Sequence, residues 1–128
     1  VELIIVIAIM AVLIGVLAPQ YLRYVEKSRY QTDATMVDNV KNAIEVAIAS
    51  NETIYTDMIT ETATGAYTIT WPTSGALSTV GWTSLDAEVQ KTIDITDTRL
   101  TSKTMIGTVP TITIDATGDV KANLPTAP

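Results

Sequence analysis

The sequence predicts an α+β protein in which a long N-terminal α-helix packs, through its C-terminal half, on a small antiparallel β-sheet. Three observations support this prediction. An uncharged apolar run opens the chain, the next segment carries apolar side chains at helical spacing, and the remainder is rich in threonine and in turn-forming residues. We therefore divide the chain into an apolar helix (1–22), an amphipathic helical half (23–51) and a β-rich part (52–128), with residues 23–128 forming one globular domain.

The apolar run covers residues 3–22, which contain no charged side chain. Twenty helical residues at about 1.5 Å rise span roughly 30 Å, the thickness of the hydrocarbon core of a bilayer. A secretory signal peptide would have a basic region before a shorter apolar stretch and a small-residue cleavage site after it, and this run has neither. The sequence therefore predicts a membrane-spanning helix that stays in the mature protein.

Glu2 is the one acidic residue at the start of this run. An ionised carboxylate at bilayer depth costs a few kcal/mol and needs a partner, which the run itself does not supply. The alternative is that Glu2 stabilises the first turn of its own helix at the membrane surface, where the helix dipole favours an acid.

Gly15 and Pro19 interrupt the apolar helix. Proline lacks the N–H that would bond to the carbonyl group four residues earlier, here that of Gly15. One interpretation is a kink in a membrane helix, where both residue types are common. The other is a site where the helix unwinds, and the spacing leaves both open.

The second half of the predicted helix is amphipathic. Apolar side chains recur at the 3.6-residue helical period from residue 36 onward, and charged side chains occupy the other face. The residues predicted to pack on the sheet are Val37, Val40, Ile44, Ala47 and Ile48. We expect Asn51 to end the helix, because asparagine tolerates the left-handed conformation found at many helix ends.

Beyond residue 52 the sequence predicts three or four strands, from alternating or concentrated β-branched and aromatic residues. The predicted ranges are 66–71, 105–109, 111–116 and 119–124. The last two should form a hairpin whose turn uses Gly118 at positive φ. Residues 84–93 are predicted as a short helix with Ser84 as its N-cap, and residues 72–82 as a surface loop.

The composition argues against an enzyme. The chain has neither cysteine nor histidine, so no disulfide, no thiol nucleophile and no neutral-pH histidine acid or base is available. We expect no cofactor. The formal net charge is −6, and only Arg23, Lys27 and Arg29 form a basic cluster, so the sequence does not indicate nucleic-acid binding.

Several polar residues could be modified or bind metal. Calcium requires six or more oxygens from a shaped loop, and the acid pairs Asp94/Asp97 and Asp115/Asp119 lie in no such pattern, so we predict solvated acids and no metal site. Asn51 begins a glycosylation sequon, which competes with its role at the helix end. The many threonines could carry O-linked sugars, although we favour them as solvent-facing strand residues.

Three tyrosines, Tyr21, Tyr24 and Tyr30, surround the end of the apolar run, and we expect them to be interfacial packing residues.

Residues 1–30, VELIIVIAIMAVLIGVLAPQYLRYVEKSRY, resemble the N-terminal segment of type IV pilins and their pseudopilin relatives. The lone acid, the aliphatic run, the proline within it and the amphipathic helix that follows carry the resemblance. It implies a structural subunit of an extracellular filament with roles in adhesion or motility. In this family the acid, here Glu2, is neutralised by the terminal amine of a neighbouring subunit. Beyond residue 30 the likeness is one of architecture, and this chain lacks the disulfide common in the family.

The resemblance also implies partners and location. The subunit should reside in the cytoplasmic membrane before assembly, be processed by a prepilin peptidase and be polymerised by pilus assembly machinery into a helical homopolymer at the cell surface. We expect a short basic leader and an N-methylated aromatic residue to precede Val1. Arg23, Lys27 and Arg29 alone would place the globular part in the cytoplasm, whereas the leader would place it outside. Alternatives are a pseudopilin or minor pilin of a secretion or DNA-uptake system, and a monomeric, membrane-anchored binding domain.

Overall fold

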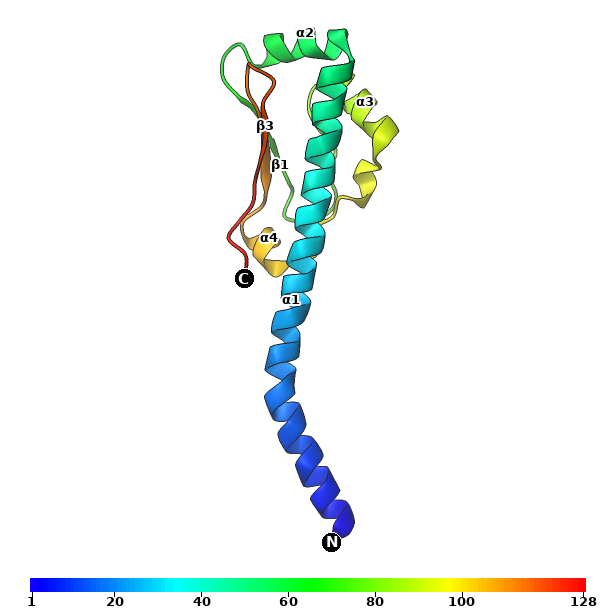
Figure 1. Cartoon of the computed structure of the whole chain (residues 1–128), viewed down its shortest axis with the longest axis vertical. Coiled ribbons are helices and arrows are strands. Elements are labelled where there is room, and N and C mark those ends of the chain that lie inside the picture. Colours follow the sequence, from blue (N-terminus) through cyan, green and yellow to red (C-terminus); the bar gives the residue numbers. More distant parts are fainter.

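The helix α1 (Glu2–Ser50) is continuous and runs the whole length of the molecule (Figure 1). The computed structural model describes all 128 residues, and the globular part surrounds only the second half of α1. Buried side chains on α1 begin at Tyr30 and end at Ile48, whereas every residue from 1 to 24 is exposed. The protein is thus a globular part carried on a projecting apolar helix.

The sheet has three short antiparallel strands, which confirms the predicted α+β fold. In order across the sheet they are β1 (Tyr67–Thr70), β2 (Thr111–Ile114) and β3 (Val120–Asn123). β2 and β3 form the expected hairpin, and Gly118 has φ +85° in its turn. In β2, Ile112 and Ile114 are fully buried while the alternate threonines are half-buried, so one face of the sheet lies on the core.

The second half of α1 forms one wall of the core. The side chains of Val37, Val40, Ile44, Ala47 and Ile48 are all buried, in one cluster of 22 residues that also contains the inward residues of the three strands. The 3.6-residue period places them on one face of the helix. α1 therefore contacts β3 on one side and α3 on the other (Figure 1).

Asn51 does not end α1 in the left-handed conformation that we expected. Its backbone is extended (φ −130°, ψ 113°), and its Oδ1 accepts hydrogen bonds from the backbone N–H groups of Thr53 at 3.0 Å and Ile54 at 3.5 Å. Asn51 is therefore the N-cap of a further helix, α2 (Glu52–Glu61), which we did not predict. α2 crosses the end of α1 (Figure 1) and buries Ile54 and Met58.

The predicted helix after residue 83 is present as α3 (Thr83–Thr92), but Ser84 is not its N-cap. The N-cap position is Trp82, which provides no side-chain cap. The hydroxyl of Ser84 lies inside the helix and donates to Asp57 Oδ2 at 2.5 Å, so it joins α3 to α2. The Ser84 hydroxyl, which we predicted to cap its own helix, instead makes a hydrogen bond to a different helix.

The strand predicted at residues 105–109 is wrong. These residues overlap the short helix α4 (Lys103–Gly107), which follows the 3-10 helix η1 (Ile95–Asp97). The hydroxyl of Ser102 caps α4 by accepting from the backbone N–H of Met105 at 3.4 Å, and Met105 is fully buried. The loop 72–82 is also less superficial than expected, because Leu77, Val80 and Trp82 belong to the core.

Candidate functional site

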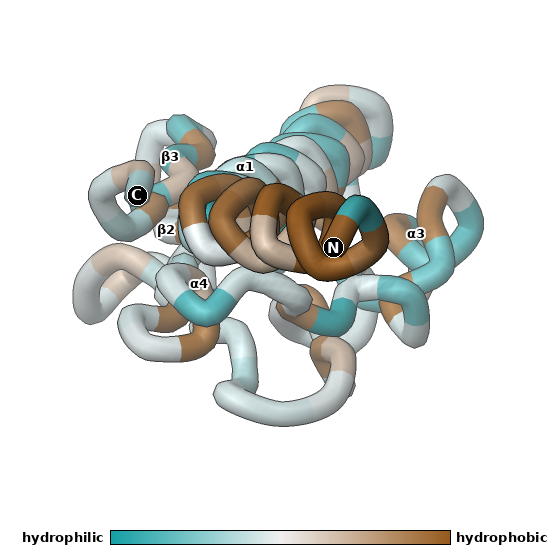
Figure 2. Tube along the Cα trace, turned by 90° about the horizontal axis from the view of Figure 1, so that it is seen from below, coloured by the Kyte–Doolittle hydropathy of each residue, from teal (hydrophilic) through white to brown (hydrophobic).

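The most unusual surface of this protein is the apolar half of α1. All residues from 3 to 22 are exposed, with about half or more of each large aliphatic side chain open to solvent. Figure 2 looks along this helix from its N-terminal end and shows that its first half is almost entirely hydrophobic, and Figure 1 shows that this half projects from the globular part. Burying one large aliphatic side chain is worth about 1.5–3 kcal/mol. An exposed run of this length therefore requires lipid or protein around it.

By length and composition α1 could cross a membrane. A core helix of a soluble protein can have the same composition, but such a helix is mostly buried, and no residue of this apolar window is buried. The apolar half of α1 thus has no partner within its own chain. We treat it, together with Glu2 and the Gly15–Pro19 turn, as the candidate functional site.

Glu2 lies in the first turn of α1 and is exposed. α1 has no side-chain cap at its N-terminus, and the three ion pairs of the molecule, Lys41–Glu45, Lys91–Glu88 and Lys121–Asp119, do not include Glu2. The carboxylate therefore has the favourable end of the helix dipole but no cation from its own chain. Burial of the apolar run in a dry environment would leave it uncompensated unless a second molecule supplied a charge.

Gly15 and Pro19 lie inside α1, which the isolated chain keeps helical throughout. No atom lies within 4 Å of the position that a Cβ on Gly15 would take, so packing does not require this glycine. The helix curves gently through its apolar half (Figure 1). Unwinding at this turn in an assembly stays a prediction.

Sequence reasoning missed two carboxylates on α1 that hold the lower end of the globular part. Asp33 is 1% exposed. Its Oδ2 accepts hydrogen bonds from the backbone N–H groups of Thr101 at 2.9 Å and Ser102 at 2.7 Å, and its Oδ1 accepts one from the hydroxyl of Thr101 at 2.9 Å. The helical period places Asp33 on the same face of α1 as Tyr30 and Val37, so the sequence already indicates a buried acid there. A buried carboxylate needs several hydrogen-bond donors from the rest of the chain.

Glu26 lies two turns earlier on α1 and makes the second contact. Its Oε1 accepts from the hydroxyl of Ser102 at 2.5 Å and from the backbone N–H of Thr104 at 3.0 Å. These bonds, the one from the Ser102 hydroxyl foremost, lower the pKa of Glu26 to about 2. Glu26 and Asp33 together fix the segment before α4 on the helix, just above the apolar half.

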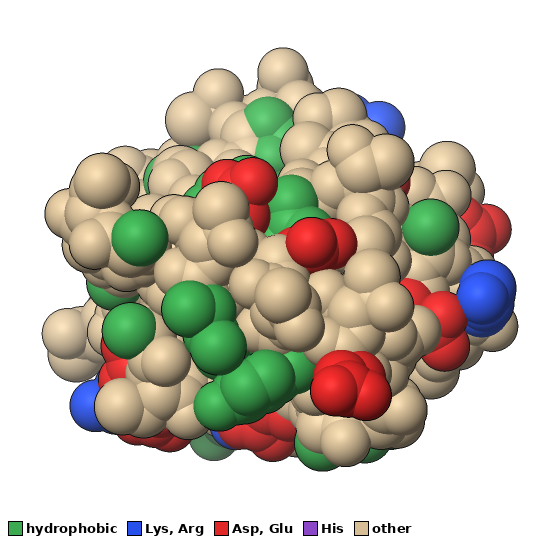
Figure 3. Space-filling view, turned by 90° about the horizontal axis from the view of Figure 1, so that it is seen from above, with side chains coloured by type: hydrophobic (Ala, Val, Ile, Leu, Met, Phe, Trp, Pro, Cys, Tyr) green, Lys and Arg blue, Asp and Glu red, His purple; other side chains and the backbone are tan.

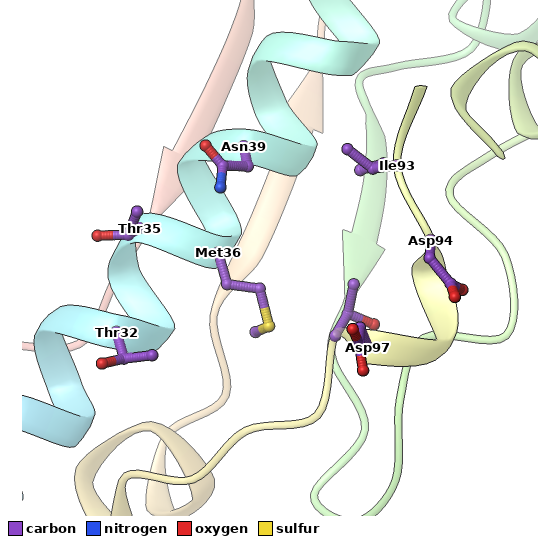
Figure 4. A pocket seen from close by; sticks show the side chains of 8 residues that line it. Thr32, Thr35, Met36, Asn39, Ile93, Asp94 and Asp97 are labelled. Carbon is purple, nitrogen blue, oxygen red and sulfur yellow. The ribbon is translucent and has the colours of Figure 1, made fainter. Parts of the chain in front are cut away.

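Two of the four acids considered as metal ligands, Asp94 and Asp115, stabilise turns. Asp94 accepts from the backbone N–H and the hydroxyl of Thr96, and Asp115 accepts in the same way from Thr117, so the pKa of each carboxyl is lowered. Asp94 and Asp97 border a surface pocket of about 450 Å³, with Thr32, Thr35 and Asn39 of α1 on its other side (Figure 4). No group of three or more potential ligands converges in the molecule.

The three tyrosines do not share one environment. Tyr21 and Tyr24 are each 69% exposed. Tyr30 is buried, and its hydroxyl donates to the backbone carbonyl of Pro125 at 2.6 Å, so it holds the C-terminal segment rather than facing an interface. The expectation of interfacial packing is therefore wrong for Tyr30.

Comparisons with protein-family models, with curated proteins and with solved structures found no match to this chain. The exposed surfaces described above and the sequence resemblance of residues 1–30 are the features of this chain that indicate its function.

Proposed function

We propose that this chain is a structural subunit of an extracellular filament of the type IV pilus kind, and that it polymerises through the apolar half of α1. The proposal rests on one observation above all: residues 3–22 form an exposed apolar helical segment that directly follows the unpaired acid Glu2. The likeness of residues 1–30 to type IV pilins, and a small antiparallel sheet packed on the same helix, agree with it.

The apolar helix suits two environments in succession. In the membrane, lipid covers the aliphatic side chains and the helix must stay continuous, because hydrocarbon cannot satisfy free backbone groups. In the filament, the corresponding helices of other subunits take the place of lipid. Prepilin peptidase and the assembly machinery are the partners that this transfer implies.

Glu2 selects the register of assembly. An unpaired carboxylate in a dry bundle of helices is strongly destabilising, so the packing that brings a cation to it is favoured over all others. The terminal amine of a neighbouring subunit is the cation that the resemblance implies. Glu2 then acts in assembly and has no catalytic role.

The Gly15–Pro19 turn allows the helix to change length. Pro19 already lacks one backbone hydrogen bond, and Gly15 adopts many backbone conformations, so this turn costs least to unwind. Extended residues rise about 3.3 Å each against 1.5 Å in a helix, so unwinding five or six lengthens the subunit by roughly 10 Å. We expect a non-helical stretch between residues 11 and 20 in the assembled state.

The experiment is electron microscopy of cells carrying Glu2→Ala, with Asp38→Ala as the matched control. Asp38 is an exposed acid on the globular half of the same helix and forms no ion pair. Glu2→Ala should reach the membrane at normal levels but form few filaments, and Asp38→Ala should resemble wild type. Normal filament number and length in Glu2→Ala would overturn the role of Glu2, and a chain that stays a detergent-extracted monomer would favour an anchored binding domain.

A further inference from the structure

The globular part carries opposite charge and exposed apolar side chains at its two ends. We define the apex as the α2 residues Glu52, Tyr55, Asp57, Ile59 and Glu61. We define the base as the residues around the point where α1 leaves the globular part, namely Arg23, Lys27, Arg29, Arg99 and Lys103. α2 and α4 mark these two ends in Figure 1.

The apex is acidic and has no cation of its own. No basic residue occurs between Lys41 and Lys91, and the three ion pairs of the molecule include none of the apex acids. Tyr55 and Ile59, one helical turn apart, remain 45% and 48% exposed. Figure 3 looks onto this end and shows acidic side chains among exposed hydrophobic ones, with basic side chains only towards the rim.

The base is basic, and its cations are also unpaired. All five basic side chains are exposed, and none takes part in an ion pair. The nearby carboxylates Glu26 and Asp33 are occupied by hydroxyl and backbone N–H donors. Even with Glu26, Asp33 and the exposed Asp97 near Arg99 all counted, the base carries a net charge of +2.

Exposed aromatic residues accompany the base as they do the apex. Tyr21 and Tyr24 lie beside Arg23 on α1, immediately below the globular part. Tyrosine and arginine are enriched among the residues that dominate protein–protein binding. Each end thus offers an apolar surface bordered by charges of one sign, and the two signs are opposite.

We propose that the apex of one copy of this chain docks on the base of a second copy. The inference rests on the proposed filament function and names the contact that joins the globular parts, outside the apolar core. Acids beside Tyr55 and Ile59 would meet the basic side chains beside Tyr21 and Tyr24. Complementary potentials of this kind fix the register of an interface and disfavour wrong ones.

The geometry makes this contact suitable for a filament. Apex and base are different surfaces, so the contact is heterologous and repeats without closing unless a rotation returns to the start. The 23 residues between Lys27 and Ser50 span about 35 Å at 1.5 Å rise. Docked copies are therefore offset by roughly 35 Å along the helix axis. The apolar half of one copy then lies beside the globular half of the other, and it bundles with the apolar halves of further copies in the filament.

The test reverses charge at each end separately and then at both. Glu52→Lys with Glu61→Lys makes the apex basic, and Arg23→Glu with Lys27→Glu makes the base acidic. Each double variant brings like charges together and should reduce filaments recovered by shearing by about tenfold. All four substitutions in one chain should restore filaments, because the signs are again opposite. Restoration would show that the double variants do not fail through misfolding or misinsertion, because the fourfold variant contains all of their substitutions.

Asp38→Lys with Asn39→Lys and Asn42→Lys is the matched control for the apex variant, because it makes the same change of +4 in net charge at exposed positions midway along the globular half of α1. It should assemble as wild type. If the wild type forms filaments and the charge-reversed double variants assemble equally well, the docking contact is overturned but the proposed filament function is not. Absence of wild-type filaments would overturn both.

Disulfide trapping gives a second measurement in a chain with no native cysteine. Glu61→Cys combined with Lys27→Cys should give a ladder of covalent oligomers when filaments are oxidised, and Asp38→Cys combined with Lys27→Cys should give none. Abundant filaments of the first variant that yield only monomer after oxidation would contradict the apex-to-base contact.

Discussion

Replacement of Asp33 by alanine should destabilise the globular part more than any change at an exposed acid. Asp33 is fully buried and accepts from two backbone N–H groups, of Thr101 and Ser102, and from one hydroxyl. Asp33→Ala leaves the buried N–H of Ser102 and the partly buried N–H and hydroxyl of Thr101 without that partner, and a buried, unsatisfied group costs about 1–3 kcal/mol. We expect a loss of about 3–5 kcal/mol in the free energy of unfolding.

Urea unfolding of the full chain in detergent measures this loss. The only two tryptophans, Trp71 and Trp82, are both buried in the core, so their fluorescence reports unfolding of the globular part. With a urea dependence of about 1–3 kcal/mol per molar for a small domain, the midpoint should fall by roughly 2 M. Asp38→Ala, at an exposed position on the same helix, is the control and should leave the midpoint unchanged.

Asp33→Asn separates hydrogen bonding from charge. Oδ2 of Asp33 accepts from the backbone N–H groups of both Thr101 and Ser102, while Oδ1 faces the hydroxyl of Thr101. An asparagine with its carbonyl oxygen in the Oδ2 position keeps both N–H bonds, and its NH₂ can donate to the Thr101 hydroxyl. We therefore expect Asp33→Asn to lose much less stability than Asp33→Ala. An unchanged midpoint in Asp33→Ala would refute the hydrogen-bonded clamp at Thr101 and Ser102.

Three further predictions test other parts of the structure. Ile44→Asp places an unpaired charge in the fully buried centre of α1's packing face and should cost several kcal/mol, measured by the same urea assay; a midpoint like that of wild type would contradict the packing. Hydrogen bonds lower the pKa of Glu26 from 4.5 to about 2, so its contribution to the free energy of unfolding is present above pH 4.5 and is lost as the pH falls towards 2. With allowance for its contact with solvent, this contribution is about 1–2 kcal/mol. Glu26→Gln should therefore make the free energy of unfolding less dependent on pH between 4.5 and 2. Pro19→Ala should make filaments less extensible under load, and unchanged force–extension curves would argue against unwinding at this turn.

Features set by local periodicity could be predicted from the sequence. The apolar positions from Val37 to Ile48 recur at the helical period, and all of them that we assigned to the packing face are buried. The hairpin of β2 and β3 follows from alternating residues on both sides of Gly118, which takes the positive φ that its turn requires. In both cases the residues that determine the structure are close together in the chain.

Features set by distant contacts could not be predicted in this way. Residues 52–61 contain β-branched threonine and isoleucine, which favour strands, but Asn51 caps them as a helix and the core buries Ile54 and Met58 on one side of it. α4 depends on Ser102, which Glu26 holds across 76 residues of sequence. The helical period places Asp33 on the buried stripe of α1, but the donors of Glu26 and Asp33 lie on a loop that only the folded chain brings to α1, so these contacts could not be predicted.

Electron cryo-microscopy of filaments sheared from the cell surface, with mass spectrometry of their subunit, tests the central claim most directly. Our account predicts filaments built mainly of this chain, with residues 3–22 packed together along the axis, the carboxylate of Glu2 against a neighbouring subunit's terminal amine, and the globular parts outside. Surface filaments made of other proteins, with this chain recovered only as a detergent-soluble monomer from the membrane, would contradict it.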